Sequence, residues 1–368
     1  MRHSKGFLIA GVLFGLWLAA SAAAAPQKSE LKTAEPDRPS GRLFYPPPPE
    51  EPRIQFLKSF SSSDDFEKPP SAFKRFIVGE EKTTRPVVKP YGVTVRDGKI
   101  YLCDTVRNGI DIFDFQTRRF RYFEPADASQ LMDPINLDFD ESGNMYVADG
   151  RRGQIVIFDP QARVVGTLGE SSEFKPTDVL IKNEKIYVCD LKTHGVKVFG
   201  LKDRKPLAGI PAEAEAARDE ARLFSPVNLA ADDEGNIYVS DIGGFRVQKY
   251  NARGEYLLSI GSHGDAPGQF ARPKGIAVDS QGRIYVVDAA FENVQIFDKN
   301  GKLLLFFGGQ TQGDEGALVL PAGIALDDTL TGYFSPLVGP GFKVDYLVLV
   351  TSQYGDRKLG VFGFGRKE

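Results

Sequence analysis

The chain from residue 90 onward is a succession of short apolar runs separated by polar turns. The runs are rich in β-branched and aromatic residues, and the turns carry Gly or Asn in segments such as RDGK, ESGN, DEGN and SQGR. These turn residues supply the positive φ that tight hairpins need. Groups of four runs recur along the chain, which predicts a series of up-and-down, four-stranded meanders.

Six such repeats can be aligned on a proline that precedes the first run of each. Their starting positions are Pro90, Pro134, Pro176, Pro226, Pro273 and Pro321. The second run is apolar at nearly every position, as in IYVVD, IYVCD and MYVAD, which is typical of a strand buried on both faces. Sheets covered on both faces by their neighbours close into a ring of blades. The pattern therefore predicts an all-β fold, a six-bladed β-propeller of four-stranded antiparallel blades.

One repeat follows a known family pattern closely. The segment from Gly261, GSHGDAPGQFARPKGIAVDSQGRIYVVD, resembles the NHL-repeat family of six-bladed β-propellers, and weaker copies extend the resemblance over about 275 residues. The resemblance implies the propeller fold and an exported member of bacterial type. It leaves the activity open, because propellers of this kind serve as interaction platforms, lyases and lactonases alike.

The sixth repeat ends without a fourth strand. A spare apolar strand, RIQFLKSF, precedes the first repeat at residues 53–60, with Ile54, Phe56 and Phe60 expected on one face. We predict that this strand is the outer strand of the blade formed by the C-terminus, so that both ends of the propeller belong to one sheet.

The N-terminal residues predict export. Arg2 and Lys5 precede an apolar run from Gly6 to Ala25 that ends in alanines, as in a secretory signal peptide over residues 1–25. A run of this length could instead act as an uncleaved signal anchor. We expect a periplasmic or extracellular protein, without a membrane span once the signal peptide is cleaved.

The rest of the chain divides into a linker and the propeller. Residues 26–52 are rich in Pro, Glu, Lys and Ser and predict a semi-rigid, extended linker, and residues 53–368 are assigned to the propeller. The formal net charge is −3, and removal of the two positive charges of the signal peptide makes it −5. Without basic clusters, the sequence gives no electrostatic reason for binding nucleic acid.

Three repeats carry a polar residue where the others have Gly, two positions after the leading proline. These residues are Asn136, Asp178 and Asn228, and we expect them at the rim of the central channel. Carboxylate and amide oxygens that converge on an axis suit calcium or a water network. The alternative is that they satisfy backbone groups at strand ends. Calcium is the only cofactor that the sequence indicates.

An acidic residue follows the second run of five repeats, and Ser352 takes its place in the sixth. We expect these carboxylates to form a structural turn ring, because an acceptor at the same corner of each repeat can bond the backbone N–H groups of the adjoining loops. The ring consists of Asp104, Asp149, Asp190, Asp241 and Asp288.

Long connections predict where binding takes place. We call face one the side of the ring where the first strand of each repeat begins, and face two the opposite side. Residues 61–89, 211–224 and 309–319 are then loops on face one. Within them, residues 212–222 predict a short helix. Arginine and aromatic side chains on this face have the composition of interface hot spots. The binding candidates are Arg107, Arg152, His194, Arg246 and Tyr354.

The two cysteines occupy the same position of different repeats. Cys103 belongs to the first repeat and Cys189 to the third, so the intervening blade keeps them on the order of 20 Å apart. A disulfide requires Cα atoms within about 7 Å. We therefore expect two buried free thiols.

The sequence favours a non-catalytic platform that binds a protein or a polymer of the cell envelope. A calcium-dependent hydrolase or lactonase with a site at the central channel is the alternative, and a structural spacer is a third reading. Amidating lyases of the family hold a catalytic zinc with histidines. Once His3 leaves with the signal peptide, only His194 and His263 remain, in different repeats, whereas a catalytic zinc usually takes three protein ligands. The identity of the partner and the oligomeric state stay open.

Overall fold

The computed structural model describes residues 42–67, 83–170, 172–309 and 315–368, which belong to one structural unit spanning residues 41–368. The signal peptide expected over residues 1–25 lies outside the described residues, as does the linker up to residue 41. Among the described residues, no helix has the length and the apolar character needed to cross a membrane.

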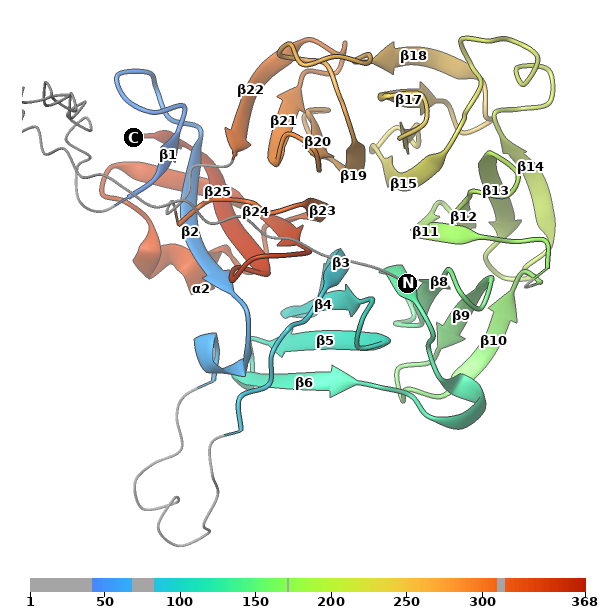
Figure 1. The fold of residues 1–368 in the computed structure, drawn as a ribbon, viewed down its shortest axis with the longest axis horizontal. Coiled ribbons are helices and arrows are strands. Elements are labelled where there is room, and N and C mark those ends of the chain that lie inside the picture. Colours follow the sequence, from blue (N-terminus) through green and yellow to red (C-terminus); the bar gives the residue numbers. More distant parts are fainter. Residues whose placement is uncertain (1–41, 68–82, 171, 310–314) are drawn as a thin grey trace, which may run out of the picture. The chain divides into compact units, whose positions relative to one another are not determined.

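Six antiparallel sheets are arranged in a ring about a central axis (Figure 1). Each sheet is one blade, and its strands follow one another from the centre to the periphery. The innermost strands each begin at the proline that marks a repeat, and they are β3 (Pro90–Arg96), β7 (Pro134–Phe139), β11 (Pro176–Lys182), β15 (Pro226–Ala231), β19 (Pro273–Val278) and β23 (Pro321–Asp327). The predicted six-bladed, all-β propeller is confirmed.

The remaining strands of each blade pair in sequence order. The second strands are β4 (Lys99–Asp104), β8 (Met145–Asp149), β12 (Lys185–Asp190), β16 (Ile237–Asp241), β20 (Ile284–Asp288) and β24 (Phe342–Ser352). The third strands are β5 (Gly109–Asp114), β9 (Gln154–Phe158), β13 (Gly195–Gly200), β17 (Arg246–Tyr250), β21 (Asn293–Phe297) and β25 (Leu359–Lys367). The outer strands of blades one to five are β6 (Arg119–Phe123), β10 (Val164–Leu168), β14 (Pro206–Ile210), β18 (Tyr256–Ile260) and β22 (Leu303–Gly308).

The second strands form the centre of each hydrophobic layer. Every residue of β8, β16 and β20 is buried, as expected for strands covered by a neighbouring blade on each side. Apolar side chains of adjacent blades interlock in six separate clusters around the ring. The core of this protein is therefore a closed series of interfaces between blades.

The ring is closed by the strand that precedes the first repeat. Strand β2 (Ile54–Phe60) pairs antiparallel with β25, with Ile54 opposite Phe364 and Phe60 opposite Leu359. It thereby supplies the outer strand that the C-terminal blade lacks (Figure 1). The predicted closure is confirmed.

The expected facing of the β2 side chains is wrong in one respect. Ile54 and Phe56 pack between blades five and six, whereas Phe60 packs between blades six and one. The reason is a β-bulge between Phe56 and Lys58, which inserts Leu57 as an extra residue and reverses the alternation beyond it. Both faces of β2 are therefore anchored in the core.

The end of the expected linker is part of the propeller. Strand β1 (Phe44–Tyr45) pairs with β2 and gives the sixth blade a fifth strand. The ring of Phe44 lies 5.3 Å from that of Phe342, and the ring of Tyr45 lies 6.0 Å from that of Phe307. Two aromatic contacts thus fix a segment that composition alone assigned to an extended linker.

Helical structure is confined to short turns. The helix expected over residues 212–222 is absent, because the chain there makes separate turns instead of a continuous ladder of i to i−4 bonds. Ala216 N bonds to Ala212 O, but Arg218 N and Ala221 N each bond three residues back. The described helices are η1 (Ser63–Asp65), η2 (Asp127–Ser129), α2 (Thr331–Phe334) and η3 (Ser335–Leu337).

Both cysteines are free and fully buried, as predicted. Cys103 packs between blades one and two, and Cys189 packs between blades three and four. Burial raises the pKa of both thiols, and nearby carboxylates raise it further. Buried neutral thiols of this kind act as small packing groups.

Truncation of Phe60 tests the closure. Its ring contacts four aromatic rings, those of Phe66, Phe113, Phe115 and Phe334. We expect Phe60→Ala to lower the free energy of unfolding by about 3 to 5 kcal/mol, because it leaves a cavity at the seam. Chemical denaturation measures this value.

The matched control is Leu304→Ala on the outer strand of blade five, where the side chain is 49% exposed. This variant should change the free energy of unfolding by no more than about 0.5 kcal/mol. Equal stability of the Phe60→Ala variant and the wild type would refute the closure.

Candidate functional site

The five carboxylates of the turn ring are fully buried and bonded to backbone N–H groups. Asp104 accepts from Val88 N (2.6 Å) and Lys89 N (3.0 Å) before its own first strand, and from Val106 N and Arg107 N after its second strand. The hydroxyl of Ser352 accepts from Val319 N in the sixth blade. A side chain in this position joins two loops of one blade on face one, which is a structural task.

The other four carboxylates make the same kind of contact. Each accepts hydrogen bonds from the one or two residues that precede the proline of its blade, and Asp149, Asp190 and Asp288 also accept from residues that follow them. Their lone pairs are therefore committed to the protein. The ring holds the loops of face one in place and does not present a free acidic cluster.

Blade one contains a further buried carboxylate, which is not part of the turn ring. Asp111, on the third strand of this blade, is fully buried, and neither of its oxygens has a hydrogen-bond partner among the described residues. Its nearest cation is Arg107, whose Nε lies 3.8 Å away. Burial, followed by the charge of Asp104, raises the pKa of Asp111 to about 8. Blade three has Lys197 at the aligned position, where it pairs with Asp190 at 3.1 Å.

The three polar residues expected at the channel rim do lie together. They line a cavity of about 140 Å³ with the first strands of the other blades. Asp178 accepts from Leu229 N of the next blade (2.7 Å), from Asn228 Nδ2 (3.3 Å) and from Val179 N (2.8 Å). The carboxylate thus bridges the first strands of blades three and four.

The same bridge recurs one blade earlier. Asp138 accepts from Ile181 N of the next blade at 2.7 Å, and burial raises its pKa to about 6. Asn136 uses its Oδ1 on its own neighbour, Leu137 N, at 3.0 Å. Its side chain lies so close to Gly92 that a Cβ at that position would be 2.1 Å from Asn136 Oδ1. Blade one therefore requires glycine where blade two has asparagine.

These contacts do not fit a calcium site. The oxygens of Asn136 and Asp178 already accept hydrogen bonds from the protein, and Asn228 Oδ1 lies 3.5 Å from the hydroxyl of Tyr91. Burial raises the pKa of Asp178 to about 8, which disfavours the charged form that a cation would need. Among the described residues, no cluster of three or more His, Cys, Asp or Glu side chains could hold a metal ion. The geometry favours the backbone-satisfying role.

The five binding candidates on face one do not form a single patch. Arg107 pairs with Glu124 (3.0 Å), and its guanidinium lies 3.7 Å from the ring centroid of Tyr122. Arg152 donates to Gln130 O, and Arg246 donates to Arg222 O. These arginines hold neighbouring loops.

The remaining two candidates are more available. Tyr354 is 51% exposed, and the Nζ of Lys89 lies 5.2 Å from its ring centroid. His194 is exposed, and its Nδ1 contacts the carbonyl oxygen of Phe224. Of the five, only His194 borders a large groove.

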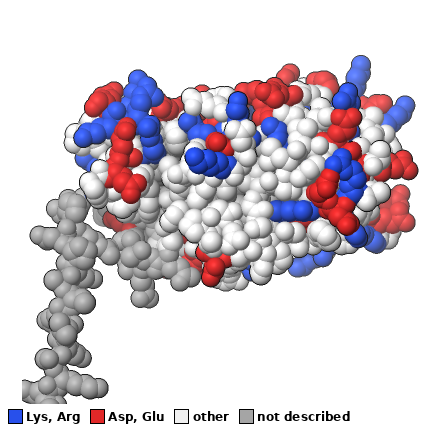
Figure 2. All heavy atoms as spheres, turned by 90° about the horizontal axis from the view of Figure 1, so that it is seen from above, with Lys and Arg blue, Asp and Glu red and all other residues white. Residues whose placement is uncertain are grey.

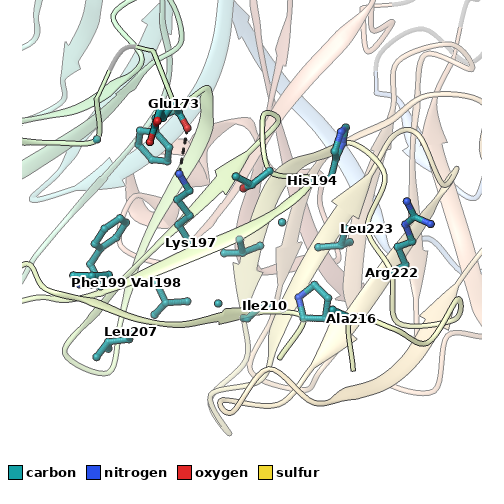
Figure 3. Close-up of a pocket in the computed structure, with 18 of the residues that line it drawn as sticks. Glu173, His194, Lys197, Val198, Phe199, Leu207, Ile210, Ala216, Arg222 and Leu223 are labelled. Atoms are coloured by element: carbon teal, nitrogen blue, oxygen red, sulfur yellow. Dashed lines mark hydrogen bonds between the residues drawn. The ribbon is translucent and has the colours of Figure 1, made fainter. Parts of the chain in front are cut away.

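This groove lies at the outer half of blade three and has a volume of about 930 Å³ (Figure 3). We call it the blade three groove. Its floor is apolar and its rim is charged. The floor includes Val196, Val198, Ile210 and Leu223, and the rim includes Glu173, His194, Lys197 and Arg222.

The walls of the groove come from three segments. Strands β13 and β14 form most of the floor. The connection between blades two and three contributes Glu173 and Phe174, and the connection to blade four contributes Ala216, Arg222 and Leu223 (Figure 3). Lys197 crosses the groove, with its Nζ 4.7 Å from the ring centroid of Phe174 and 3.4 Å from Glu173 O. An alignment of the third strands could have singled out Lys197 from the sequence. Apart from Asp111 in blade one, the other blades have an apolar or uncharged residue at this position.

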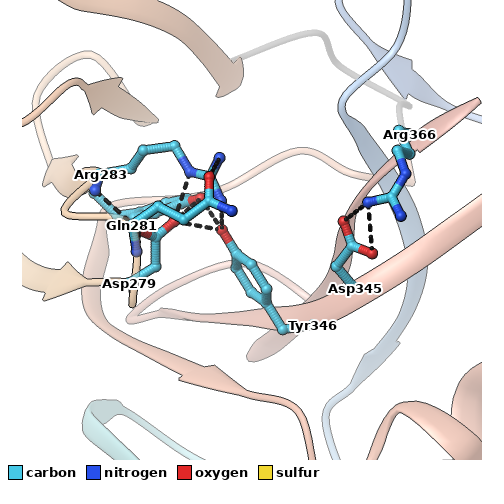
Figure 4. A network of polar contacts seen from close by, with 7 residues as sticks. Asp279, Gln281, Arg283, Asp345, Tyr346 and Arg366 are labelled. Carbon is cyan, nitrogen blue, oxygen red and sulfur yellow. Dashed lines mark hydrogen bonds and ion pairs between the residues drawn. The ribbon is translucent and has the colours of Figure 1, made fainter.

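Face two carries a polar network between blades five and six (Figure 4). Asp279 accepts from Arg283 Nε (2.6 Å) and from the hydroxyl of Tyr346 (2.7 Å). The contact with Tyr346 joins blade five to blade six. Within a blade, the equivalent aspartates accept from a tyrosine of their own second strand, Asp140 from Tyr146, Asp232 from Tyr238 and Asp279 from Tyr285 at 3.5 Å. A contact that recurs at this corner of several blades is structural.

The pH dependence of the free energy of unfolding tests whether Asp111 holds a proton in the folded protein. Its folded-state pKa of about 8 lies above the usual 3.8, so the folded protein keeps a proton that the unfolded chain releases. The free energy of unfolding should therefore fall as the pH rises from about 4 to about 8, by at most about 1.4 kcal/mol per pH unit from this residue. Asp111→Asn should remove that contribution, as measured by urea unfolding across the range.

The control for this measurement is Asp97→Asn, because the side chain of Asp97 is 74% exposed. It should leave the pH profile of the wild type unchanged. If Asp111→Asn also leaves the profile unchanged, then Asp111 does not hold a proton in the folded state.

Comparisons with known proteins agree with this architecture. The NHL repeat family model matches residues 270–297. No curated protein matches the chain. A gluconolactonase from Xanthomonas campestris has a similar structure, with a TM-score of 0.56 and 15% sequence identity over 89% of this chain and 99% of that one.

Two further solved structures share the fold. Regucalcin, a calcium-binding protein from Agrobacterium tumefaciens, has a TM-score of 0.51 and 13% identity over 77% of this chain and 92% of its own. Virginiamycin B lyase from Staphylococcus aureus has a TM-score of 0.51 and 12% identity over 76% of this chain and 96% of its own. At such identities the likeness concerns the fold alone. The chain is a six-bladed β-propeller with an NHL repeat at residues 270–297.

Proposed function

We propose that the chain is an exported, non-catalytic propeller that binds a protein or polymer partner of the cell envelope through the blade three groove. The observation that carries the proposal is the groove itself, a hollow of about 930 Å³ with an apolar floor and charged rim. Export rests on the signal-peptide pattern of residues 1–25.

The composition of the groove suits a macromolecular partner. Apolar area at the centre with polar and charged groups around it is the usual anatomy of a protein interface. Carboxylates from blade two stand at one end of the groove, and Arg222 and His194 stand at the other. A segment of a partner with an apolar centre and charges of both signs would match it. Leu207, which is 47% exposed on the outermost strand, offers an additional apolar contact.

The groove is built where the repeat is interrupted. The connection over residues 211–224 joins blades three and four, and it is longer than the corresponding connections in most other blades. Ala221 and Leu223 belong to this connection, and their buried side chains hold the wall against the propeller. A loop fixed on a rigid scaffold is the arrangement that binding sites commonly use.

A second apolar surface provides a control region. The outer strands β18 and β22 contain no charged residue, and the side of the ring that carries them has a broad uncharged area (Figure 2). Leu304 is 49% exposed there, close to the exposure of Leu207. The two surfaces differ in composition, because the blade three groove is surrounded by a polar rim.

Matched charge substitutions test the proposal. Immobilised wild-type protein should retain a partner from the envelope fraction of its own cells, and Leu207→Asp should reduce the amount retained at least tenfold, because it puts an unpaired carboxylate against an apolar contact. Leu304→Asp should leave retention unchanged. Equal retention by both variants, or no specific retention by the wild type, would overturn the proposal.

The alternative of a calcium-dependent hydrolase or lactonase has its own test. Because the channel oxygens are engaged by the protein, millimolar calcium should leave the melting temperature of this propeller unchanged. A bound ion at one hundred times its Kd would add about 2.7 kcal/mol to the free energy of unfolding. A calcium-dependent rise that is lost in Asp178→Asn would instead support the alternative.

A further inference from the structure

A buried lysine lies at the mouth of the central channel on face one. Lys274 is the second residue of β19, and it is only 5% exposed. Its Nζ donates to Gln353 Oε1 of blade six at 3.1 Å and lies 5.0 Å from the ring centroid of Tyr91 in blade one. The lysine therefore extends from blade five across blade six to blade one.

The charge of Lys274 is not balanced by a carboxylate of the described residues. Among the described residues, no carboxylate forms an ion pair with its ammonium group. The ammonium has three N–H donors, and one of them is used by Gln353. Burial, then the positive charges of Arg272 and Lys89, lower the pKa of Lys274 to about 8. A buried cation with unused donors provides a site for an added acceptor with negative charge.

A second donor lies beside the ammonium. Gln353 is 7% exposed, and its Oε1 is the atom that accepts from Lys274. Its amide nitrogen, Nε2, makes no hydrogen bond within the described part of the chain. The amide group is held in this orientation by the lysine. The Lys274 ammonium and the Gln353 amide come from different blades and are joined by this hydrogen bond, and both groups carry N–H donors of the kind that bind oxyanions.

Further cations stand around the same opening. Lys89, Lys175 and Arg272 each occupy the position before the leading proline, in blades one, three and five. The only acid at that position is Asp133, and its pKa is raised by burial and by Asp149. The carboxylates of the turn ring do not neutralise these cations directly, since their oxygens bond to backbone N–H groups.

Tyr91 separates this mouth from the channel cavity. Its hydroxyl lies 3.5 Å from Asn228 Oδ1 of blade four, so its ring spans the axis from blade one. The residues that line the cavity follow later in the same strands, beginning with Val93 in β3 and Gly275 in β19. A ligand at Lys274 would therefore arrive from face one and rest on the ring of Tyr91.

The geometry points to an oxyanion-binding site formed by Lys274 and Gln353, which takes a carboxylate or phosphate group of a ligand at the mouth of the channel. This site is separate from the blade three groove and does not depend on the function proposed for it. Because Lys274 and Gln353 are 5% and 7% exposed, we expect a single terminal group to reach them while the rest of the ligand stays on face one, near Lys89 and Arg272.

Binding can be measured with simple anions as probes. Inorganic phosphate and citrate are added separately to the full mature chain, with sodium chloride at matched ionic strength as the reference, and the melting temperature and calorimetric affinity are recorded. Either anion should raise the melting temperature above the chloride reference. The anion that gives the larger rise in melting temperature shows whether the site prefers a phosphate or a carboxylate group.

Substitutions assign the effect to the site. Lys274→Met should weaken anion binding at least tenfold, and it should be no less stable than the wild type in chloride, because it removes an unpaired buried charge. Lys299→Met, an exposed substitution on the same blade, should bind anions as the wild type does. Leu207→Asp should also keep full anion binding, which separates this site from the groove.

A second variant guards against a folding defect of the first. Gln353→Glu places a carboxylate beside Lys274, so it should pair with the lysine and abolish anion binding while the propeller stays folded. The proposed site would be overturned if phosphate or citrate raised the melting temperature of Lys274→Met or Gln353→Glu as much as that of the wild type. A wild-type response no greater than that to chloride would overturn it as well.

Discussion

The pairing of β2 with β25 is the constraint on which the rest of this propeller depends. The apolar second strands are buried only because every blade has a neighbour on both sides, and this holds for all six blades only if the ring is closed. The bulge at Leu57 allows one strand to serve both interfaces of the sixth blade, with Ile54 facing blade five and Phe60 facing blade one. The short strand β1 then covers the outer edge of β2.

Acidic side chains connect the loops and strands of the closed ring through hydrogen bonds. Each carboxylate of the turn ring ties the loops of its own blade, and Asp138 and Asp178 tie the first strand of one blade to the next through backbone N–H groups. Carboxyl groups that are satisfied by several amides are structural elements. These hydrogen bonds account for the positions of the carboxylates near the axis.

The groove and the oxyanion site that we propose both lie where the repeat is broken. The long connection over residues 211–224 produces a groove, and Lys274 replaces the uncharged residues found at the equivalent position of the other blades. Asp111 is another exception to the repeat, and its two oxygens have no hydrogen-bond partner among the described residues. A repeat supplies the scaffold, and the exceptions to the repeat supply its chemistry.

The sequence by itself determined the six blades, their start at the leading prolines, the closing strand, the buried cysteines and the positions of the carboxylate ring. These features follow from local patterns, namely turn residues, strand periodicity and repetition, which act within one repeat. The tertiary structure decided the facing of Phe60 beyond the bulge, the absence of a helix after Ala212, the engagement of Asp178 and the burial of Lys274. These properties depend on atoms supplied by other blades, and no pattern within a single repeat contains them.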